Sequence, residues 1–222
     1  MNPSLETPVR HDTKERILDV AERLFADHDF PATTLRDITT EAGVNLAAVN
    51  YHFRSKEALL SAVLHRRLGP VNARRRELLE QARQNAHGGK LVLEDVVRAF
   101  IQPVYEARGA GIELGNFARL MARVATAQGD WAVSAMREQM QATVDRFLPL
   151  LAEAMDTENS TTVAMAMQLT VGAMAHSMKH SPSLVNMFGA DASALPPTEH
   201  LEQLLCYIVG GMRALAAREN GR

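Results

Sequence analysis

The chain has 222 residues, of which 46% are hydrophobic, 23% are charged and 5% are aromatic. This length allows one or two domains with a sizeable core, and the apolar content excludes a chain that is disordered throughout. Because the formal net charge is only −2, the composition also excludes a protein that binds nucleic acid through a uniformly basic surface.

Two features predict where the protein works. The single Cys206 cannot form an internal disulfide, which is typical of a reducing compartment. Met1–Arg10 has no apolar core of the kind that a secretory signal needs, and the longest apolar run, Leu204–Met212, is far below the ~20 residues that cross a bilayer. We therefore expect a soluble cytoplasmic protein with no membrane partner.

Three short helices are predicted at the start of the chain. Asp12 and Glu15 form a capping box for the first helix, which reaches about His28. Its apolar positions recur at helical spacing, at Ile17, Val20, Ala21, Leu24 and Phe25. Thr34 caps a second, two-turn helix whose buried side carries Leu35, Ile38 and Ala42.

A glycine turn leads into the third helix. Gly43 permits the positive φ that closes one helix and redirects the chain, and Asn45 caps a helix that runs only to about Tyr51. A helix this short is unstable alone, so its neighbours must hold it. The expected anchors are Val44, Val49 and Phe53.

The rest of the chain reads as helix. A long fourth helix begins at Ser55, and Gly69-Pro70 should kink or break it, because proline lacks an N–H and clashes with the previous turn. A polar loop, Asn85–Lys90, follows. Five further helices are expected at about Leu93–Arg108, Leu114–Ala127, Asp130–Met155, Ser160–His180 and Pro197–Arg218. The predicted fold is all-α, with about nine helices in two domains, residues 1–54 and 55–222.

The stretch from Gly43 to Phe53, Gly-Val-Asn-Leu-Ala-Ala-Val-Asn-Tyr-His-Phe, is followed directly by the serine cap of the fourth helix. It resembles the signature of the tetracycline-repressor (TetR) family of bacterial transcriptional regulators, whose usual form is close to Gly-Val-Ser-x-x-x-x-Tyr-x-His-Phe-x-x-Lys-x-x-Leu. The resemblance implies a helix-turn-helix DNA-binding domain and a C-terminal helical bundle that binds a ligand and forms a homodimer.

The resemblance also implies a set of DNA contacts on an operator. They are Thr34, Arg36, Leu46, Ala47, Ala48, Asn50, Tyr51, His52 and Lys56. The residue types suit the task, because alanines allow close approach, an asparagine amide pairs with adenine, and an arginine forks onto guanine. Alternatives remain open for four of them. Tyr51 could instead pack in the core, Arg36 could pair with an acid, and Asn50 could be merely solvated. Leu46 is a contact or a core residue.

The C-terminal half predicts a pocket for an apolar ligand. Pro103 and Pro149 lie inside helical patterns, and bent helices enclose cavities. Methionines, including Met121, Met140 and Met174, suit a pocket for flexible apolar ligands, although each can equally be core filler. The polar end of the ligand is assigned to Arg119 and Asn116, with a surface ion pair as the alternative for Arg119.

Four short segments resemble a fatty-acid-responsive subgroup of the family from pseudomonads. They are Gly43–Asn50, Leu68-Gly69-Pro70, Asn116–Leu120 and Gly211–Ala214. This second resemblance implies a fatty acid or an acyl-CoA as effector.

The pattern of chemical residues does not indicate an enzyme. His176 and His180 have the spacing of a metal pair, but no third ligand follows, so we expect no metal. Gly88-Gly89-Lys90 lacks the upstream glycine of a phosphate-binding loop. Cys206 lies in an apolar helix, where inert packing is expected. We expect no cofactor.

The last two helices carry broad apolar stripes that predict a four-helix dimer interface over residues 160–215. The stripes are Val163, Met167, Val171 and Met174 on one helix, and Leu201, Leu204, Leu205, Ile208, Val209, Met212 and Leu215 on the other. Burial within one chain is the alternative. Together these features predict a repressor that leaves its operator when a small ligand binds. The rival is a ligand carrier or enzyme with a vestigial helix-turn-helix.

Overall fold

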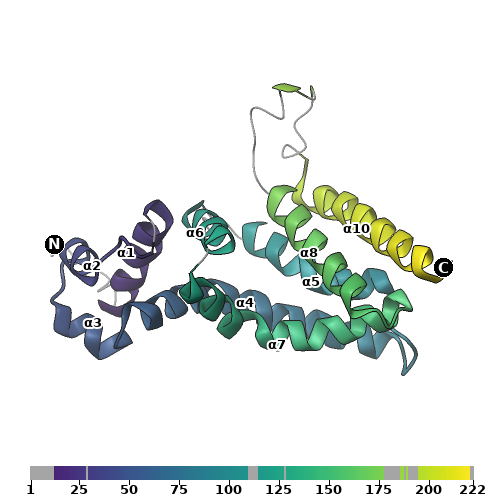
Figure 1. The fold of residues 1–222 in the computed structure, drawn as a ribbon, viewed down its shortest axis with the longest axis horizontal. Coiled ribbons are helices and arrows are strands. Elements are labelled where there is room, and N and C mark those ends of the chain that lie inside the picture. Colours follow the sequence, from purple (N-terminus) through teal and green to yellow (C-terminus); the bar gives the residue numbers. More distant parts are fainter. Residues whose placement is uncertain are drawn as a thin grey trace, which may run out of the picture. The chain divides into compact units, whose positions relative to one another are not determined.

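The computed structural model describes residues 13–28, 30–109, 115–127, 129–177, 186–187, 189 and 195–220. These residues form nine helices and no strand (Figure 1), which confirms the predicted all-α fold. The helices are α1 Thr13–Asp27, α2 Leu35–Ala42, α3 Leu46–Phe53, α4 Lys56–Asn85, α5 Leu93–Gly109, α6 Gly115–Thr126, α7 Asp130–Met155, α8 Ser160–Ser177 and α10 Pro197–Asn220. None of them is long and apolar enough to cross a membrane.

The chain divides into two compact units. The N-terminal unit comprises Met1–Gly69 and Glu113–Gln139, and the C-terminal unit comprises Pro70–Ile112 and Met140–Arg222. Two long helices, α4 and α7, therefore run from one unit into the other. The predicted boundary between a DNA-binding domain, residues 1–54, and a ligand-binding domain, residues 55–222, is defined by function and not by packing, and it stays a prediction.

The short helices are fixed by the caps that the sequence predicts. Asp37 N donates to Thr34 Oγ1 at 3.1 Å, and the Thr34 amide donates back to the Asp37 carboxylate at 2.9 Å, which completes a capping box at α2. Gly43 has a φ of 62° and closes α2, and Asn45 Oδ1 accepts from the Ala48 amide at 2.9 Å. Asp12, the predicted first cap, lies outside the described residues.

The helix α4 does not break at Pro70. It is continuous over 30 residues, so the predicted break is wrong. Proline removes one backbone hydrogen bond from the helix. The helix stays continuous because side chains on both sides of Pro70 anchor it, each within its own unit. Arg66 and Arg67 donate to Glu22 of α1 in the N-terminal unit, and Arg74 donates to Glu106 of α5 in the C-terminal unit.

The core of the N-terminal unit forms where α1 packs against α2, α3 and α6. Most of the predicted anchors are buried there, but Val20, Leu35 and Val44 are half-buried. The buried anchors are Ile17, Ala21, Leu24, Phe25, Ile38, Ala42, Val49 and Phe53. Glu22 is 2% exposed, and its carboxylate accepts from both Arg66 and Arg67. This buried ion cluster fixes the first half of α4 on α1.

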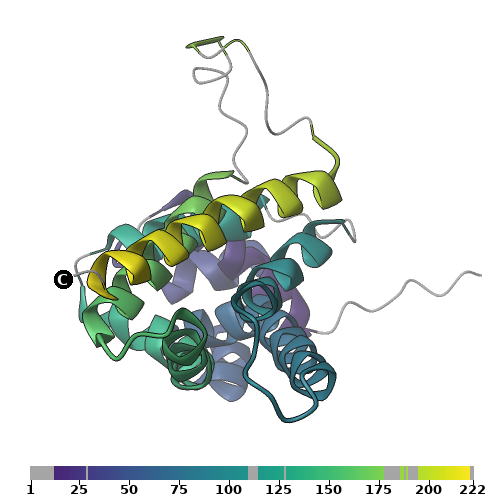
Figure 2. The same cartoon turned by 90° about the vertical axis from the view of Figure 1, so that its right-hand side faces the viewer.

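The core of the C-terminal unit explains the broad stripe on the last helix. The helix α10 packs along α8 and α5 (Figure 2). Ile208 is 6% exposed and belongs to this core, as do Leu201, Leu204, Leu205, Val209 and Met212. The predicted assignment of this stripe to a dimer interface is therefore wrong, because the stripe is buried within one chain. Cys206 is exposed, so its predicted packing role is wrong as well.

Candidate functional site

The helix α3 turns one edge to solvent. Val49 and Phe53 are 0% and 5% exposed and hold the helix on the core. Leu46 is 50% exposed, and Tyr51, on the side of the helix away from these two anchors, is 84% exposed. Ala47 and Asn50 are also exposed, and Ala48 and His52 are half-buried at the margins. Four of the six predicted contacts of α3 are thus exposed and two are half-buried, on the sides of the helix that do not carry Val49 and Phe53.

In the described part of the chain the structure decides against three of the open alternatives. Tyr51 does not pack in the core, and its ring meets only the edge of the His52 ring at 5.1 Å. Arg36 is exposed, and in the described part of the chain no carboxylate pairs with it. Leu46 is on the solvent side. Against the signature quoted above, Asn50 occupies the tyrosine position, so the contact roles of Asn50 and Tyr51 depend on their exposure.

Lys56 has a structural partner. Its ammonium donates to the Phe30 carbonyl at 2.8 Å and the Thr33 carbonyl at 2.9 Å, and it lies 4.4 Å from the centroid of the Phe30 ring. These bonds hold the loop between α1 and α2 against the start of α4. A phosphate contact by Lys56 would be made by an ammonium that is already occupied.

Thr34 is engaged in a similar way. Its hydroxyl donates to Asp37 Oδ2 at 2.7 Å, and these hydrogen bonds lower the pKa of the Asp37 carboxyl. Its predicted phosphate contact would therefore have to share the hydroxyl with Asp37.

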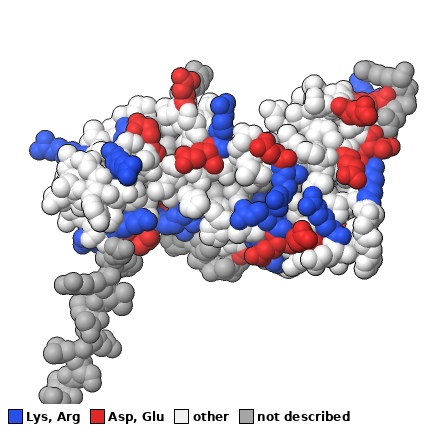
Figure 3. Space-filling view, turned by 90° about the horizontal axis from the view of Figure 1, so that it is seen from below, with Lys and Arg blue, Asp and Glu red and all other residues white. Residues whose placement is uncertain are grey.

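Charges of both signs are interspersed on the face shown in Figure 3. In the N-terminal unit several cations are already paired, because Arg23 pairs with Glu41, and Arg66 and Arg67 with Glu22. Arg54 is exposed directly after α3 and has a φ of 67°, which ends that helix. It is a candidate phosphate contact that the pattern of the signature does not single out. Affinity for DNA would depend on a few local cations.

Comparison with known families agrees with this geometry. Residues 17–63 match the family described as "Bacterial regulatory proteins, tetR family", and residues 98–211, just over half of the chain, match the "Tetracyclin repressor-like, C-terminal domain". The chain belongs to the TetR family. It is a DNA-binding transcriptional regulator, and the prediction that it is not an enzyme is confirmed by the function of this family.

Relatives of this TetR-family chain are matched over short stretches. It is 48% identical over 50 residues to the uncharacterized regulator YerO of Bacillus subtilis, covering 22% of the chain and 17% of the relative. It is 32% identical over 77 residues to the transcriptional repressor KstR2 of Rhodococcus jostii, covering 35% and 38%. The matches thus span less than half the length of these relatives.

Solved structures show the same fold over nearly the whole chain. A TetR-family regulator from Streptomyces coelicolor has a TM-score of 0.55 at 22% identity, covering 92% of this chain and 96% of that one. FadR of Bacillus subtilis, solved in complex with stearoyl-CoA, has a TM-score of 0.53 at 18% identity, covering 86% and 96%.

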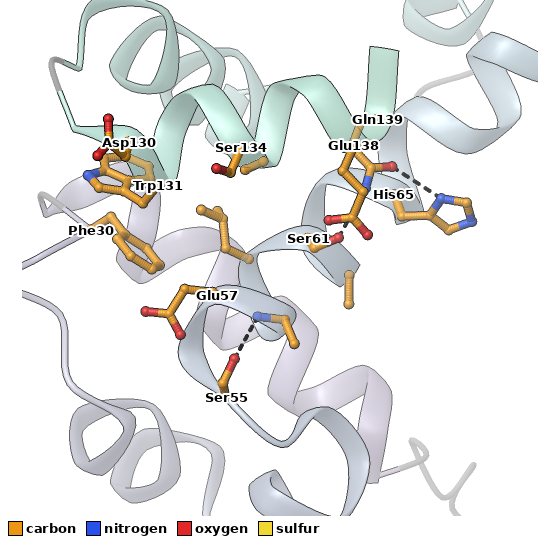
Figure 4. Close-up of a pocket in the computed structure, with 14 residues that line it drawn as sticks. Phe30, Ser55, Glu57, Ser61, His65, Asp130, Trp131, Ser134, Glu138 and Gln139 are labelled. Atoms are coloured by element: carbon orange, nitrogen blue, oxygen red, sulfur yellow. Dashed lines mark hydrogen bonds between the residues drawn. The ribbon is translucent and has the colours of Figure 1, made fainter. Parts of the chain in front are cut away.

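The N-terminal unit contains an open pocket of about 690 Å³ between the first turns of α4 and of α7. Figure 4 shows Glu57, Asp130 and Glu138 around it, with the Trp131 ring stacked on Phe30 at 4.5 Å. No Lys or Arg lines this pocket, and none of the predicted ligand residues does so. It therefore differs from the predicted apolar site.

The predicted ligand residues are placed in different surroundings. Arg119 donates to Asp27 of α1 at 2.8 Å and to Asn116 at 2.7 Å, so the surface ion pair is the arrangement present. Met121 is half-buried on α6 of the N-terminal unit. Met140 and Met174 are half-buried against the core of the C-terminal unit. The five residues are thus divided between the two units, and only Asn116 and Arg119 are hydrogen-bonded to each other.

A buried arginine in the C-terminal unit was not singled out by the sequence. Arg75 is 3% exposed, its Nε donates to the Phe100 carbonyl at 2.9 Å, and its Nη1 donates to Asn72 Oδ1 at 2.9 Å. The run Arg74-Arg75-Arg76 reads as a solvated charge cluster, which hides the one member that points inward. Only the helical register of α4, with Leu68, Val71 and Leu79 also buried, carries that signal.

The described residues contain no cluster of three or more side chains that could hold a metal ion. His176 is exposed at the end of α8, and His180 lies outside the described residues.

Proposed function

We propose that this TetR-family regulator is a homodimeric repressor whose operator is released when an apolar or acyl effector binds. The observation that carries the DNA part is the edge of α3. A helix held by two buried residues presents Ala47, Asn50 and Tyr51 to solvent with no partner in the core. The direction of regulation is inferred by analogy with the repressor KstR2.

The proposed dimer uses a different face from the buried stripe. The exposed side of α8 carries Met165, Leu169 and Gly172, and the exposed side of α10 carries Tyr207 and Gly210. A Cβ added to Gly172, Gly210 or Gly211 would meet no atom within 4 Å, so the chain's own packing does not require these glycines. Each costs helix stability, about 0.5–1 kcal/mol relative to alanine. Close approach of a second copy would explain them.

The two terminal helices α8 and α10 pack on each other, so a two-fold copy would complete a four-helix bundle. Such a dimer would present two α3 helices to a pseudo-palindromic operator. The exposed tyrosine, methionine and leucine are typical of an interface core.

The proposed response travels through α6 and α7. Within the N-terminal unit, Arg123 of α6 donates to the carbonyls of Ala26 at 2.7 Å and Asp27 at 2.9 Å, at the C-terminal end of α1. Arg119 adds its ion pair with Asp27. The helix α7 continues from this unit into the C-terminal unit. A ligand that favours another position of α6 or α7 would therefore move α1, which packs on α3.

The test of the DNA part is binding of purified protein to the DNA upstream of its own gene, with unrelated DNA as competitor. We expect one protected pseudo-palindrome. Sequence-blind association would refute the proposal and favour the rival carrier or enzyme.

The test of the effector part is release of that DNA by fatty acids and acyl-CoA thioesters of increasing length. The acyl class is suggested by the FadR structure that holds stearoyl-CoA. The only tryptophan, Trp131, stacks on Phe30 beside the loop that leads to α2, so its fluorescence should change as the DNA is released. If DNA is bound and no acyl compound displaces it, the repressor remains and the ligand class is wrong.

A further inference from the structure

A guanidinium ion lies in the core of the C-terminal unit with no negative charge beside it. Arg75 is 3% exposed, and in the described part of the chain no carboxylate pairs with it. Its exposed neighbour Arg74, by contrast, bridges Glu77 and Glu106. Desolvating an unpaired charge costs several kcal/mol, so a structure that keeps one needs a reason.

The hydrogen bonds of Arg75 go to neutral groups on three helices. Nε donates to the carbonyl of Phe100 on α5, and Nη1 donates to Asn72 Oδ1 on α4 and lies 3.9 Å from the sulfur of Met140 on α7. The guanidinium also lies 4.1 Å from the centroid of the Phe100 ring. Nη2 makes no hydrogen bond to a described residue, so one edge of the fork stays unused.

Part of this arrangement has a structural cause. Pro103 lies inside α5 and has no N–H for the carbonyl of Ala99, and its ring crowds the preceding turn, which contains Phe100. The Nε–H of Arg75 satisfies the Phe100 carbonyl. A neutral side chain could donate the same hydrogen bond to the Phe100 carbonyl at a smaller desolvation cost. The bond therefore explains why a donor is present, but it does not explain why that donor carries a positive charge.

We infer that Arg75, assisted by Asn72, binds the carboxylate of an apolar monocarboxylic acid in the core of the C-terminal unit. Nη2, at the unused edge of the guanidinium, would donate to one carboxylate oxygen, and the aromatic and thioether groups of Phe100 and Met140 would contact the start of the hydrocarbon chain. The depth of Arg75 favours a free acid over a CoA thioester, because the CoA moiety is too large and too polar to be buried there.

Burial lowers the pKa of the Arg75 guanidinium to about 10, so the group keeps its charge at neutral pH. The ligand would arrive as the anion and form a charge-assisted pair with it. This inference deepens the proposed function, since it names the anchor of the effector, but binding to Arg75 can be measured without DNA.

The test compares decanoate with decanamide, which has the same length and a planar but uncharged head. Calorimetric titration of the full-length protein should show about tenfold or greater preference for decanoate, equivalent to at least ~1.4 kcal/mol. Arg75→Met should abolish this preference. Arg76→Met is the matched control, because Arg76 is exposed on the same helix and its loss changes the net charge equally.

A second variant guards against misfolding. Arg75→Gln keeps a donor for the Phe100 carbonyl and removes the charge, so it should fold and bind decanoate no better than decanamide. Decanoyl-CoA is the third ligand. Its affinity should be the same for wild type and for Arg75→Gln, because a CoA thioester has no free carboxylate for Arg75 to bind.

Three results would overturn the inference. The first is equal affinity of wild type for each acid and its amide, across the series from hexanoate to palmitate. The second is a preference for decanoate over decanamide that persists in Arg75→Gln. The third is a loss of this preference in Arg76→Met as large as that in Arg75→Met. Failure here, with specific operator binding intact, would leave the repressor proposal standing. If wild type prefers decanoate but binds no specific operator, the repressor proposal fails and the assignment of Arg75 as a carboxylate anchor stands.

Discussion

The ammonium of Lys56 donates to the carbonyl of Phe30 at 2.8 Å and also lies over the ring of that residue. Lys56 thus holds the start of α4 against the loop that leads to α2, although its spacing matches that of a DNA contact in the family signature. Loss of Lys56 would leave the Phe30 and Thr33 carbonyls without this donor, and both positions are buried.

We therefore expect Lys56→Met to lower the free energy of unfolding by about 1–3 kcal/mol, the cost of removing a charged donor from a buried carbonyl such as that of Phe30. Urea unfolding followed by circular dichroism measures this. The salt dependence of DNA binding should change little, because the ammonium is not free for phosphate. An unchanged stability together with a flatter salt dependence would instead make Lys56 a phosphate contact.

The second prediction concerns Asn50, which is exposed on α3. Asn50→Ala should reduce operator affinity by about 1–3 kcal/mol and relax discrimination at one base position in each half-site. Stability should be unaffected, because the side chain makes no contact in the core. Competition binding with a set of single-base operator variants measures the effect. Asn85→Ala, an exposed change in the C-terminal unit, is the control, and equal behaviour of the two variants would refute the assignment.

The third prediction separates the fold from the dimer by two adjacent residues of α10. Tyr207 is 75% exposed and Ile208 is 6% exposed. Ile208→Glu would bury an unpaired charge in the core and should unfold the protein. Tyr207→Glu should leave the helices intact and shift sedimentation from dimer to monomer. A folded Tyr207→Glu dimer as tight as wild type would place the interface elsewhere.

The fourth prediction concerns Arg119. Its ion pair with Asp27 joins side chains that are 57% and 34% exposed, and such pairs are worth about 0–1 kcal/mol. Arg119→Gln should therefore change stability little and leave decanoate affinity unchanged. A marked loss of decanoate affinity in this variant, measured by the same calorimetry, would return the anchor role to Arg119.

The local signals in the sequence were sufficient for the helices. Thr34, Asn45 and Ser55 cap α2, α3 and α4 as predicted, because a capping side chain acts on amides within three residues of itself. The bounds of α7, Asp130–Met155, were likewise predicted correctly. Of the two outcomes predicted at Gly69-Pro70, a kink or a break, the break does not occur, because side chains on both sides of Pro70 anchor α4 to residues far away in the sequence.

Orientation was harder to predict than the elements. Apolar periodicity showed that Ile208 is buried, but it could not show whether its partner is the same chain or another. Arg75 and Arg76 are adjacent and chemically identical, and only packing decides that one is buried and the other exposed. The buried anchors Val49 and Phe53 of α3 were predicted correctly, and the DNA-contact roles of the exposed residues stay predictions.

The measurement that tests the account most directly is a footprint of the purified protein on the DNA upstream of its gene. We expect protection of two symmetric half-sites whose centres are about 34–36 Å, or a multiple, apart. Asn50→Ala should need a higher protein concentration for the same protection, and Asn85→Ala should behave as wild type. Protection without a repeated half-site, or association that follows salt alone and ignores both sequence and Asn50, would contradict the assignment of α3 as the element that reads DNA.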